Sequence, residues 1–386
     1  MRIVVGLATV GAGALVALGV ACSSSSSVPP PPANESTQCS TDAGQFPVAN
    51  CVPYDPASQS CTSPALSCNT APCDSTSPCL AMGADNTGQA VANFRMRKLN
   101  ITAPDALAFQ PPSHVFVQKA VIDQGIYLHN FCGENRDGTF SWLIQVDTKN
   151  NTVKTGGAPP TDDPFGKGYC FVDATLSGLN VAPVTVNLTK ASDGTYTSDK
   201  IPKLYVPIYS PAASGGYQTI ILPLTDAQVK DVALSESNNC IGSYNADAIT
   251  SLQGSACLDD PTSCSRWTTA GSLGGFITLD EANGVAVPQL SETLCMLLSP
   301  TAPVDTSDPN LKKCAVDSAG HVQATGDYCS TTQSPGGCKD SDWLAATFAA
   351  SAAKIVDPNQ PDCMGSATTG DGGTGDGGSP VDAGGQ

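Results

Sequence analysis

Cysteine content is the feature that most constrains how this chain can fold. Its 386 residues include 17 cysteines, and no two of them are separated by only two residues. Paired zinc ligands are therefore not indicated, and the three histidines, His114, His129 and His321, show no zinc-ligand spacing either. Many cysteines without metal-ligand spacing are typical of exported proteins, where they form disulfides.

The N-terminus carries an export signal. An uncharged apolar stretch follows Arg2, and the small residues Gly19 and Ala21 stand just before Cys22. The segment from Leu18 to Cys22 resembles the lipobox of bacterial lipoproteins, in which the cysteine is lipidated and becomes the new N-terminus. It departs from that pattern at Gly19, where leucine is commonest. The alternatives are a retained single-pass span, which the length of the stretch permits, and ordinary cleavage before Cys22.

The lipobox resemblance has three implications. Residues 1–21 would be a signal peptide, Cys22 would carry the lipid, and residues 22–38, rich in Ser and Pro, would be a tether. Ser23 after the cysteine favours the outer membrane or the cell surface. Setting Cys22 aside leaves 16 cysteines, an even number that allows up to eight disulfides.

The charge balance argues against nucleic acid as a partner. The net charge is −17, no Lys or Arg lies between Arg2 and Arg95, and none follows Lys354. The one basic cluster, Arg95, Arg97 and Lys98, is expected to be a solvated strand entry. Charged residues make up only 14% of the chain, which favours a turn-rich β protein outside the cytoplasm.

Four segments follow the tether. Residues 39–93 form a Cys-rich module whose few large apolar residues require disulfides for stability. Residues 94–245 are rich in β signals, and residues 246–364 read as a disulfide-rich continuation with both strands and helices. Residues 365–386, rich in Gly and Asp, are expected to be disordered.

The middle segment has the alternation typical of strands. Strands are predicted at residues 114–123, 125–132, 140–146, 152–155, 184–190, 195–197, 203–209 and 218–224. The third and fourth form one predicted hairpin and the fifth and sixth another. Pro207 and Pro223 place their strands at edges or bulges, and residues 225–233 fit a helix or a strand equally.

The last segment contains the expected helices. A capping box at Thr278 and Glu281 starts one, residues 290–298 form a buried helix carrying Cys295, and residues 341–356 form the most regular one. Cysteines close the loops around them: Cys257 and Cys264 in one loop, then Cys314, Cys329, Cys338 and Cys363. The fold class is therefore mainly β, an antiparallel β-sandwich or partly open barrel with a few C-terminal helices and many disulfides.

No arrangement of residues identifies a reaction. The sequence lacks nucleophile-elbow, phosphate-loop and zinc-protease motifs. His129, next to Asn130, is read as a structural histidine. Glu134, Asn135 and Asp137 are weak calcium candidates without EF-hand spacing. The acidic pairs Asp162-Asp163 and Asp259-Asp260 are read as solvated turns.

The function expected from these features is a non-catalytic binding or structural module of the cell envelope. In style the chain resembles surface lipoproteins of Gram-negative soil bacteria with large genomes. Its partners would be the membrane, through a lipid on Cys22, and a glycan or another envelope protein; no cofactor is expected. Tyr127, Phe140 and Trp142 could stack on a sugar, although aromatic residues on strands more often belong to the core. The alternative is an anchored or secreted hydrolase of polysaccharides, with its acids on the loops of the β segment.

Overall fold

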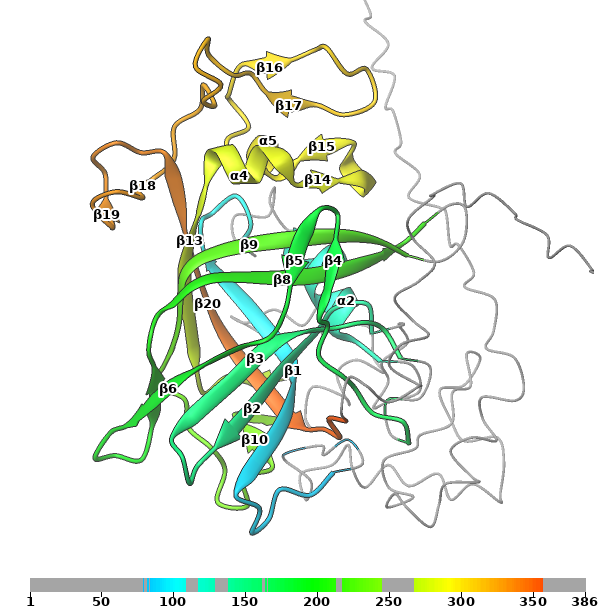
Figure 1. Cartoon of the computed structure of the whole chain (residues 1–386), viewed down its shortest axis with the longest axis vertical. Helices are drawn as coiled ribbons and strands as arrows, with labels where there is room; N and C mark the ends of the chain where they lie inside the picture. The colour runs from blue at the N-terminus through cyan, green and yellow to red at the C-terminus, as the bar shows by residue number, and fades with distance from the viewer. Residues whose placement is uncertain are drawn as a thin grey trace, which may run out of the picture.

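An antiparallel sheet curled into a half-barrel forms the body of the protein (Figure 1). The computed structural model describes residues 79, 82, 84–108, 117–128, 138–161, 164, 166–212, 217–244 and 267–356. In these residues strands far outnumber helices, and the strand pairs of the large sheet are antiparallel. The predicted fold class is confirmed, in its form of a partly open barrel.

Nine strands follow one another across the sheet, and within the described residues three short strands pair at its margins. The order across the sheet is β7 (Tyr196–Ser198), β6 (Val184–Lys190), β3 (Thr152–Ala158), β2 (Ser141–Asp147), β1 (Val91–Ala103), β20 (Ser341–Ala352), β13 (Ser272–Thr278), β9 (Tyr217–Lys230) and β8 (Ile201–Pro211). The short strands are β10 (Cys240–Ile241), β18 (Tyr328–Cys329) and β19 (Ser334–Pro335).

Smaller elements surround this sheet. The two-stranded ladders are β4 (Ala174–Leu176) with β5 (Leu179–Val181), β11 (Ser243–Tyr244) with β12 (Trp267–Thr268), β14 (Ala286–Val287) with β15 (Glu292–Thr293), and β16 (Val304–Asp305) with β17 (Lys313–Cys314). The helical segments are the π-helix η4 (Val117–Asp123), α2 (Gln124–Ile126), α4 (Leu279–Gly284), the 3₁₀-helix η5 (Pro288–Leu290) and α5 (Leu294–Leu298).

The two predicted hairpins are present, and their turn residues explain them. In β2–β3, the Asp147 carboxylate accepts hydrogen bonds from the backbone N–H groups of Lys149 and Asn150, at 3.0 and 2.8 Å. In β6–β7, Asp193 accepts in the same way from the backbone and side chain of Thr195. Local turn chemistry therefore sets both hairpins, as the sequence predicted.

The prolines of β8 and β9 lie where the sheet needs no N–H donor. β8 is the last strand of the sheet, so Pro207 lies on an edge. Pro223 lies outside the part of β9 that pairs with β13, which begins at Thr225. Pro207 is therefore on an edge strand, as one of the predicted alternatives, and Pro223 is on a stretch of the inner strand β9 that pairs on one side only. The undecided residues 225–233 continue β9 as far as Lys230.

One edge strand of the curled sheet, β7, meets the end of β9 and the residue Val232 that follows it, next to the other edge of the sheet. Tyr196 and Val232 exchange both backbone hydrogen bonds, each of 2.9 Å. Next to them the Gln228 side-chain amide donates to the Ser198 carbonyl at 2.7 Å, and the Val229 N–H donates to the Ser198 hydroxyl at 3.1 Å. These contacts hold the sheet in its curled shape.

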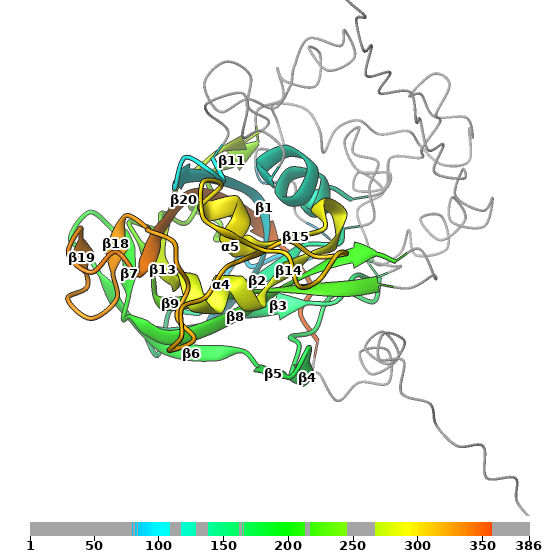
Figure 2. The same cartoon turned by 90° about the horizontal axis from the view of Figure 1, so that it is seen from above.

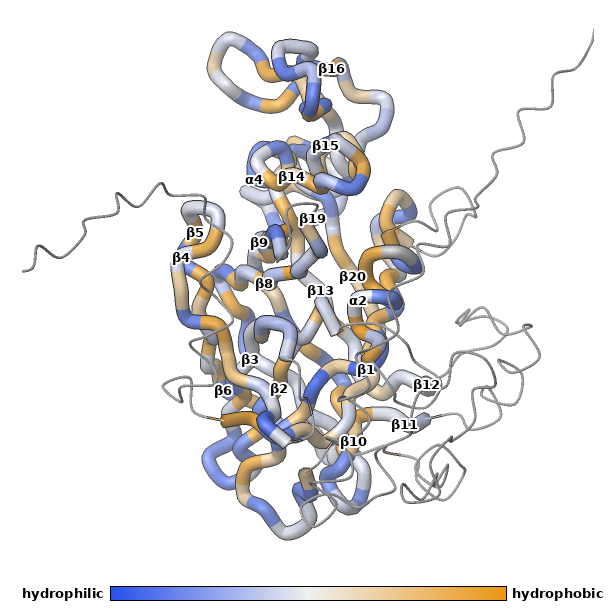
Figure 3. The backbone as a smooth tube through the Cα atoms, turned by 90° about the vertical axis from the view of Figure 1, so that its right-hand side faces the viewer, coloured by the Kyte–Doolittle hydropathy of each residue, from blue (hydrophilic) through white to orange (hydrophobic). Residues whose placement is uncertain are grey.

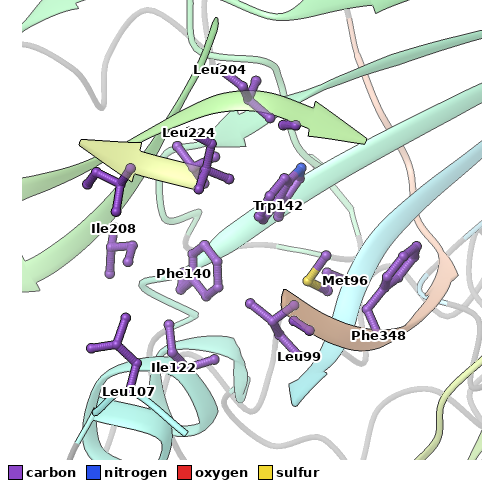
Figure 4. Packing of buried hydrophobic residues seen from close by; sticks show 14 of the residues in the cluster. Met96, Leu99, Leu107, Ile122, Phe140, Trp142, Leu204, Ile208, Leu224 and Phe348 are labelled. Atoms are coloured by element: carbon purple, nitrogen blue, oxygen red, sulfur yellow. The ribbon is translucent and has the colours of Figure 1, made fainter. Parts of the chain in front are cut away.

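The concave side of the sheet is filled by the main hydrophobic core. Met96 and Leu99 of β1, Trp142 of β2, Leu204 of β8 and Phe348 of β20 converge there (Figure 4). Seen from above, α4 and α5 lie over one end of this interior (Figure 2), and their buried residues belong to the same core. Figure 3 shows hydrophobic stretches both within the sheet and in the helical segment around α2. A cavity within this core, next to Met96, Trp142 and Phe348, has a volume of about 20 Å³, which is room for about one water molecule. The interior is therefore a packed core.

The helix predicted for residues 341–356 is wrong: residues Ser341–Ala352 form β20, between β1 and β13. Its alanines favour a helix in isolation, but tertiary pairing on both sides overrides that preference. Trp343 and Phe348, expected on one face of a helix, are five residues apart and so lie on opposite faces of a strand. Phe348 enters the core, whereas Trp343 lies on the outer face.

The strands predicted at residues 114–123 and 125–132 are also wrong in their described parts. Val117–Asp123 form a π-helix and Gln124–Ile126 continue it. Short apolar runs fit either period, and here helical winding places Ile122 and Ile126 in the core. It also directs Gln118 toward β1, where its side-chain amide donates to the Leu99 carbonyl at 2.8 Å.

The predicted capping box is confirmed at α4, whereas the helix predicted for residues 290–298 is shorter than expected. The Glu281 N–H donates to the Thr278 hydroxyl at 3.3 Å, and that hydroxyl donates to the Glu281 carboxylate at 3.0 Å. Only Leu294–Leu298 are α-helical, and Cys295 is buried on that helix as expected. Ser291, with a φ of 53°, separates this helix from η5.

Disulfides are present, as predicted. Cys79 is bonded to Cys240, Cys295 to Cys314 and Cys329 to Cys338, and Cys170 is also in a disulfide. The other cysteines lie outside the described residues, as do the predicted signal peptide, the predicted tether and the predicted disordered tail. β1 begins at Val91, before the boundary expected at residue 94. β13 and β20, from the predicted continuation, lie between β1 and β9 in the same sheet.

Candidate functional site

Most of the site residues expected from the sequence lie outside the part of the chain that the structure describes. They are Cys22, His114, His129, Glu134, Asn135, Asp137, Asp162, Asp163, Asp259 and Asp260. The ends of the segment that carries the calcium candidates are held together, because the Gly138 N–H donates to the Tyr127 carbonyl at 2.9 Å. The calcium and acidic-pair interpretations therefore stay predictions.

The aromatic group on the strands belongs to the core. Phe140 and Trp142 are buried, with ring centroids 6.3 Å apart, and the Trp142 indole donates to the Thr155 hydroxyl at 2.7 Å. Tyr127 is half-buried. The core interpretation is confirmed for Phe140 and Trp142, which are not available to stack on a sugar.

The basic cluster on β1 is buried, so the expected solvated strand entry is wrong. Arg95, Arg97 and Lys98 expose 0%, 0% and 1% of their surface. The Lys98 ammonium lies 2.9 Å from a carboxylate oxygen of Asp123. A bulge in the β1–β20 pairing between Met96 and Lys98 interrupts the alternation of β1.

The two arginines support an outer layer of aromatic side chains. The Arg95 guanidinium donates to the Ser141 hydroxyl at 3.0 Å and to the Ile126 carbonyl at 2.9 Å, and it lies 5.4 Å from the Tyr169 ring centroid. Arg97 lies 5.4 Å from the Trp267 ring centroid. Because these cations are inaccessible to solvent, we assign them a structural role.

His321 is the one histidine among the described residues, and it makes a surface contact. Its Nδ1 atom lies 2.9 Å from a carboxylate oxygen of Asp280. The hydrogen bond to Asp280, followed by the charges of Asp280 and Asp317, raises the pKa of His321 above its usual value. Both partners are well exposed, which is typical of a weak surface ion pair.

Three aromatic rings meet on the outer face of the sheet, where β13, β18 and β20 come together. We call this group the aromatic corner: Phe276 on β13, Tyr328 on β18 and Trp343 on β20. The Tyr328 ring centroid lies 5.3 Å from that of Phe276 and 5.2 Å from that of Trp343. Phe276 and Tyr328 are buried, so the half-buried Trp343 is the ring that reaches the surface.

Gly274 fixes the position of the Trp343 indole. A Cβ atom at residue 274 would lie 2.8 Å from Cζ2 of Trp343, so the indole packs directly against the backbone of β13. The indole is thereby supported by Gly274 and by Tyr328. Such support favours a rigid surface ring over a mobile one.

Two carboxylates bracket the aromatic corner. The Asp327 N–H donates to Oδ1 of Asp342 at 3.1 Å, and the Trp343 N–H donates to Oδ1 of Asp327 at 2.9 Å. Asp327 is exposed, whereas Asp342 exposes only 5% of its surface. Burial, and to a lesser degree the charge of Asp327, raises the pKa of Asp342 to about 6, although the bond from the Asp327 N–H opposes this shift.

A disulfide fastens the loop that carries Tyr328. Cys329 and Cys338 close it, and Asp340 accepts hydrogen bonds from the N–H and hydroxyl of Ser330, at 2.8 and 2.6 Å. The two sulfurs and a carboxylate oxygen of Asp340 lie within 4.8 Å of one another. Because the sulfurs are bonded to each other, this group is not available as a set of metal ligands.

Sequence reasoning missed the aromatic corner because its members come from distant parts of the chain. Residues 276, 328 and 343 share no local pattern, and the predicted helix at residues 341–356 turned Trp343 toward the core. Residues 342–346, Asp-Trp-Leu-Ala-Ala, show no alternation of polar and apolar residues, so no local strand signal is present there.

Two further results bear on function. Among the described residues, no helix combines the length and hydrophobicity needed to cross a lipid bilayer. The sequence matches no protein-family model, and comparisons with curated proteins and with solved structures find no match.

Proposed function

We propose that this protein is a non-catalytic binding module of the bacterial cell envelope, anchored by a lipid on Cys22, with the aromatic corner as its glycan-binding surface. The observation that carries the binding proposal is the half-buried Trp343 indole, which packs against Gly274 and against the Tyr328 ring. Lipidation, export and the outer membrane or cell surface as location rest on the lipobox resemblance and the disulfides.

A sugar ring suits this surface chemically. One face of many sugar rings presents C–H groups, which pack well on an aromatic ring that is already held in place. The hydroxyl groups at the edge of the sugar need acceptors, and the exposed Asp327 carboxylate lies next to Trp343. The β18–β20 pairing and the Cys329–Cys338 disulfide support both side chains, so little ordering is required on binding.

The binding test uses the full mature protein, oxidised and solubilised in detergent, against a panel of immobilised cell-wall and plant polysaccharides. We expect one or more polysaccharides to bind, and Trp343→Ala to weaken binding at least tenfold, or about 1.4 kcal/mol. Tyr205→Ala is the matched control, since Tyr205 is a half-buried aromatic residue on β8, away from the aromatic corner. Equal binding by Trp343→Ala and the unaltered protein, or no binding to any member of the panel, would contradict the proposal.

The lipid anchor has a separate test. Labelled fatty acid should enter the protein in a bacterial host, and Cys22→Ser should abolish the labelling. Unlabelled protein that begins at residue 22 in the soluble fraction would show ordinary cleavage instead.

A polysaccharide hydrolase is the second candidate, and one observation favours it. Asp342 has a raised pKa and Asp327 is exposed, which is the pairing of acid and carboxylate that glycosidases use. Against it, Asp342 is almost fully buried and already accepts a hydrogen bond from the Asp327 N–H. Release of reducing ends from the same panel, abolished by Asp327→Asn, would establish the hydrolase.

A further inference from the structure

Near its N-terminal end, β20 buries the carboxyl group of Asp342, and the surroundings of this group solvate a negative charge poorly. Asp342 exposes 5% of its surface, and its Oδ1 atom accepts one hydrogen bond, from the Asp327 N–H at 3.1 Å. Within the described residues its Oδ2 atom is buried and has no hydrogen-bond partner. By strand alternation the side chain shares the inner face of β20 with Ala346 and Phe348, which belong to the core. An ionised carboxylate is unfavourable in such a place. The side chain is stable there when it is protonated, and when it ionises it needs contact with water.

The charged groups around Asp342 do not offset its charge. Asp327 faces it from the segment before β18 and adds a second negative charge. On β13, the residue opposite Asp342 is Ile277, which carries no charge. The neighbouring acids have other partners: Asp340 bonds to Ser330 and Ser341, Asp280 of α4 to His321, and Glu281 of α4 to Lys203.

Asp342 also holds the aromatic corner together. The contact between its Oδ1 and the Asp327 N–H ties the residue before Tyr328 to β20, and the Asp327 carboxylate in turn accepts the Trp343 N–H. We propose that Asp342 is a pH-sensitive latch: it holds the aromatic corner closed while its buried carboxyl group is protonated. Ionisation loosens the corner, because burial and the facing Asp327 carboxylate disfavour the charge more than the Asp327 N–H favours it.

The direction follows from proton linkage. An acid whose pKa is higher in the closed state than in the open state binds its proton more tightly when closed. For Asp342 the value in the folded protein is about 6, against 3.8 for an exposed aspartate. The closed state therefore weakens as pH rises from 4 toward 6, and levels off above that. Control of ligand binding by the latch rests on the function proposed above, whereas the latch itself does not.

Amide hydrogen exchange at the two donors, Asp327 N–H and Trp343 N–H, tests the latch without any ligand. After correction for intrinsic exchange rates, we expect the protection of both amides to fall about tenfold between pH 5 and pH 7. Asp342→Asn keeps an oxygen acceptor but cannot ionise, so its protection should not vary with pH. Asp305→Asn is the matched control: Asp305 is a partly exposed turn aspartate with a lowered pKa, and its variant should show the same fall as the unaltered protein.

A second variant keeps the test decisive if Asp342→Asn does not fold. Asp327→Asn retains the backbone donor and removes the facing charge, so the midpoint of the fall should move to lower pH. Protection that is constant from pH 5 to pH 7 in the unaltered protein, or an equal fall in Asp342→Asn, would overturn the latch. Glycan binding with constant protection would refute the latch alone, and a working latch without glycan binding would refute the proposed function alone.

Discussion

At the scale of single residues, β1 carries buried charge. Lys98 and Asp123 each expose 1% of their side chains and are 2.9 Å apart, and the Gln118 side-chain amide also donates to Asp123 at 2.8 Å. This network of hydrogen bonds and charges joins the π-helix η4 to β1. Removing one member of a buried pair leaves the other charge in a medium that solvates it poorly, so such pairs are sensitive to substitution.

Asp123→Ala should therefore destabilise the protein by about 3 to 5 kcal/mol, measured by urea unfolding. The matched control is Lys200→Ala, which removes an ion pair with Asp226; the Lys200 side chain is 52% exposed and that of Asp226 is 17% exposed. That exposed pair should contribute about 0 to 1 kcal/mol. Similar losses in the two variants would contradict the distinction between buried and exposed pairs.

At the scale of elements, β18 reaches β20 through an unusually close approach of two backbones. Tyr328 pairs with Ser341, and the Gly326 N–H donates to the Lys339 carbonyl at 2.8 Å. A Cβ atom at residue 326 would lie 2.0 Å from the Ser341 carbonyl oxygen. That atom belongs to the backbone of a central strand, so it cannot move away cheaply, and only glycine fits at this position.

Gly326→Ala should separate β18 from β20 and expose the aromatic corner. We expect a loss of more than about 1 kcal/mol in the free energy of unfolding, and a shift in the fluorescence of Trp343. Gly284→Ala is the control, because a Cβ atom there meets nothing within 4 Å and the backbone needs no positive φ. An unchanged Gly326→Ala variant would show that the approach of the two backbones is looser than the structure indicates.

The same elements show how far the sequence could predict this fold. The hairpins β2–β3 and β6–β7 were predictable because Asp147 and Asp193 specify their turns locally. β20 was not, since its alanines favour a helix and only pairing with β1 and β13 makes it a strand. The aromatic corner was not predictable for the same reason: it exists only once β20 is a strand next to β13 and β18.

At the scale of the whole molecule, disulfides with very different sequence separations cross-link the chain. Cys79–Cys240 joins residues 161 positions apart, whereas Cys329–Cys338 spans 9. The first is reinforced by Asn86, whose backbone N–H donates to the Asn239 side chain at 2.7 Å. The chain that leads into β1 is thereby attached beside β10, at the margin of the sheet.

Removing each disulfide separately should show how the sequence separation of the two cysteines affects the stability of the protein. In the chain-entropy model a disulfide stabilises by restricting the unfolded chain, by about 5 kcal/mol for the longer loop and about 2.5 kcal/mol for the shorter one. Cys79→Ser with Cys240→Ser should therefore lower the midpoint of guanidinium unfolding more than Cys329→Ser with Cys338→Ser. The second pair should instead act locally, increasing hydrogen exchange at Tyr328 and Trp343. If the shorter cross-link proves the more stabilising, native contacts of the Cys329–Cys338 loop outweigh loop entropy, and the aromatic corner is a larger source of stability than the attachment of the N-terminal segment.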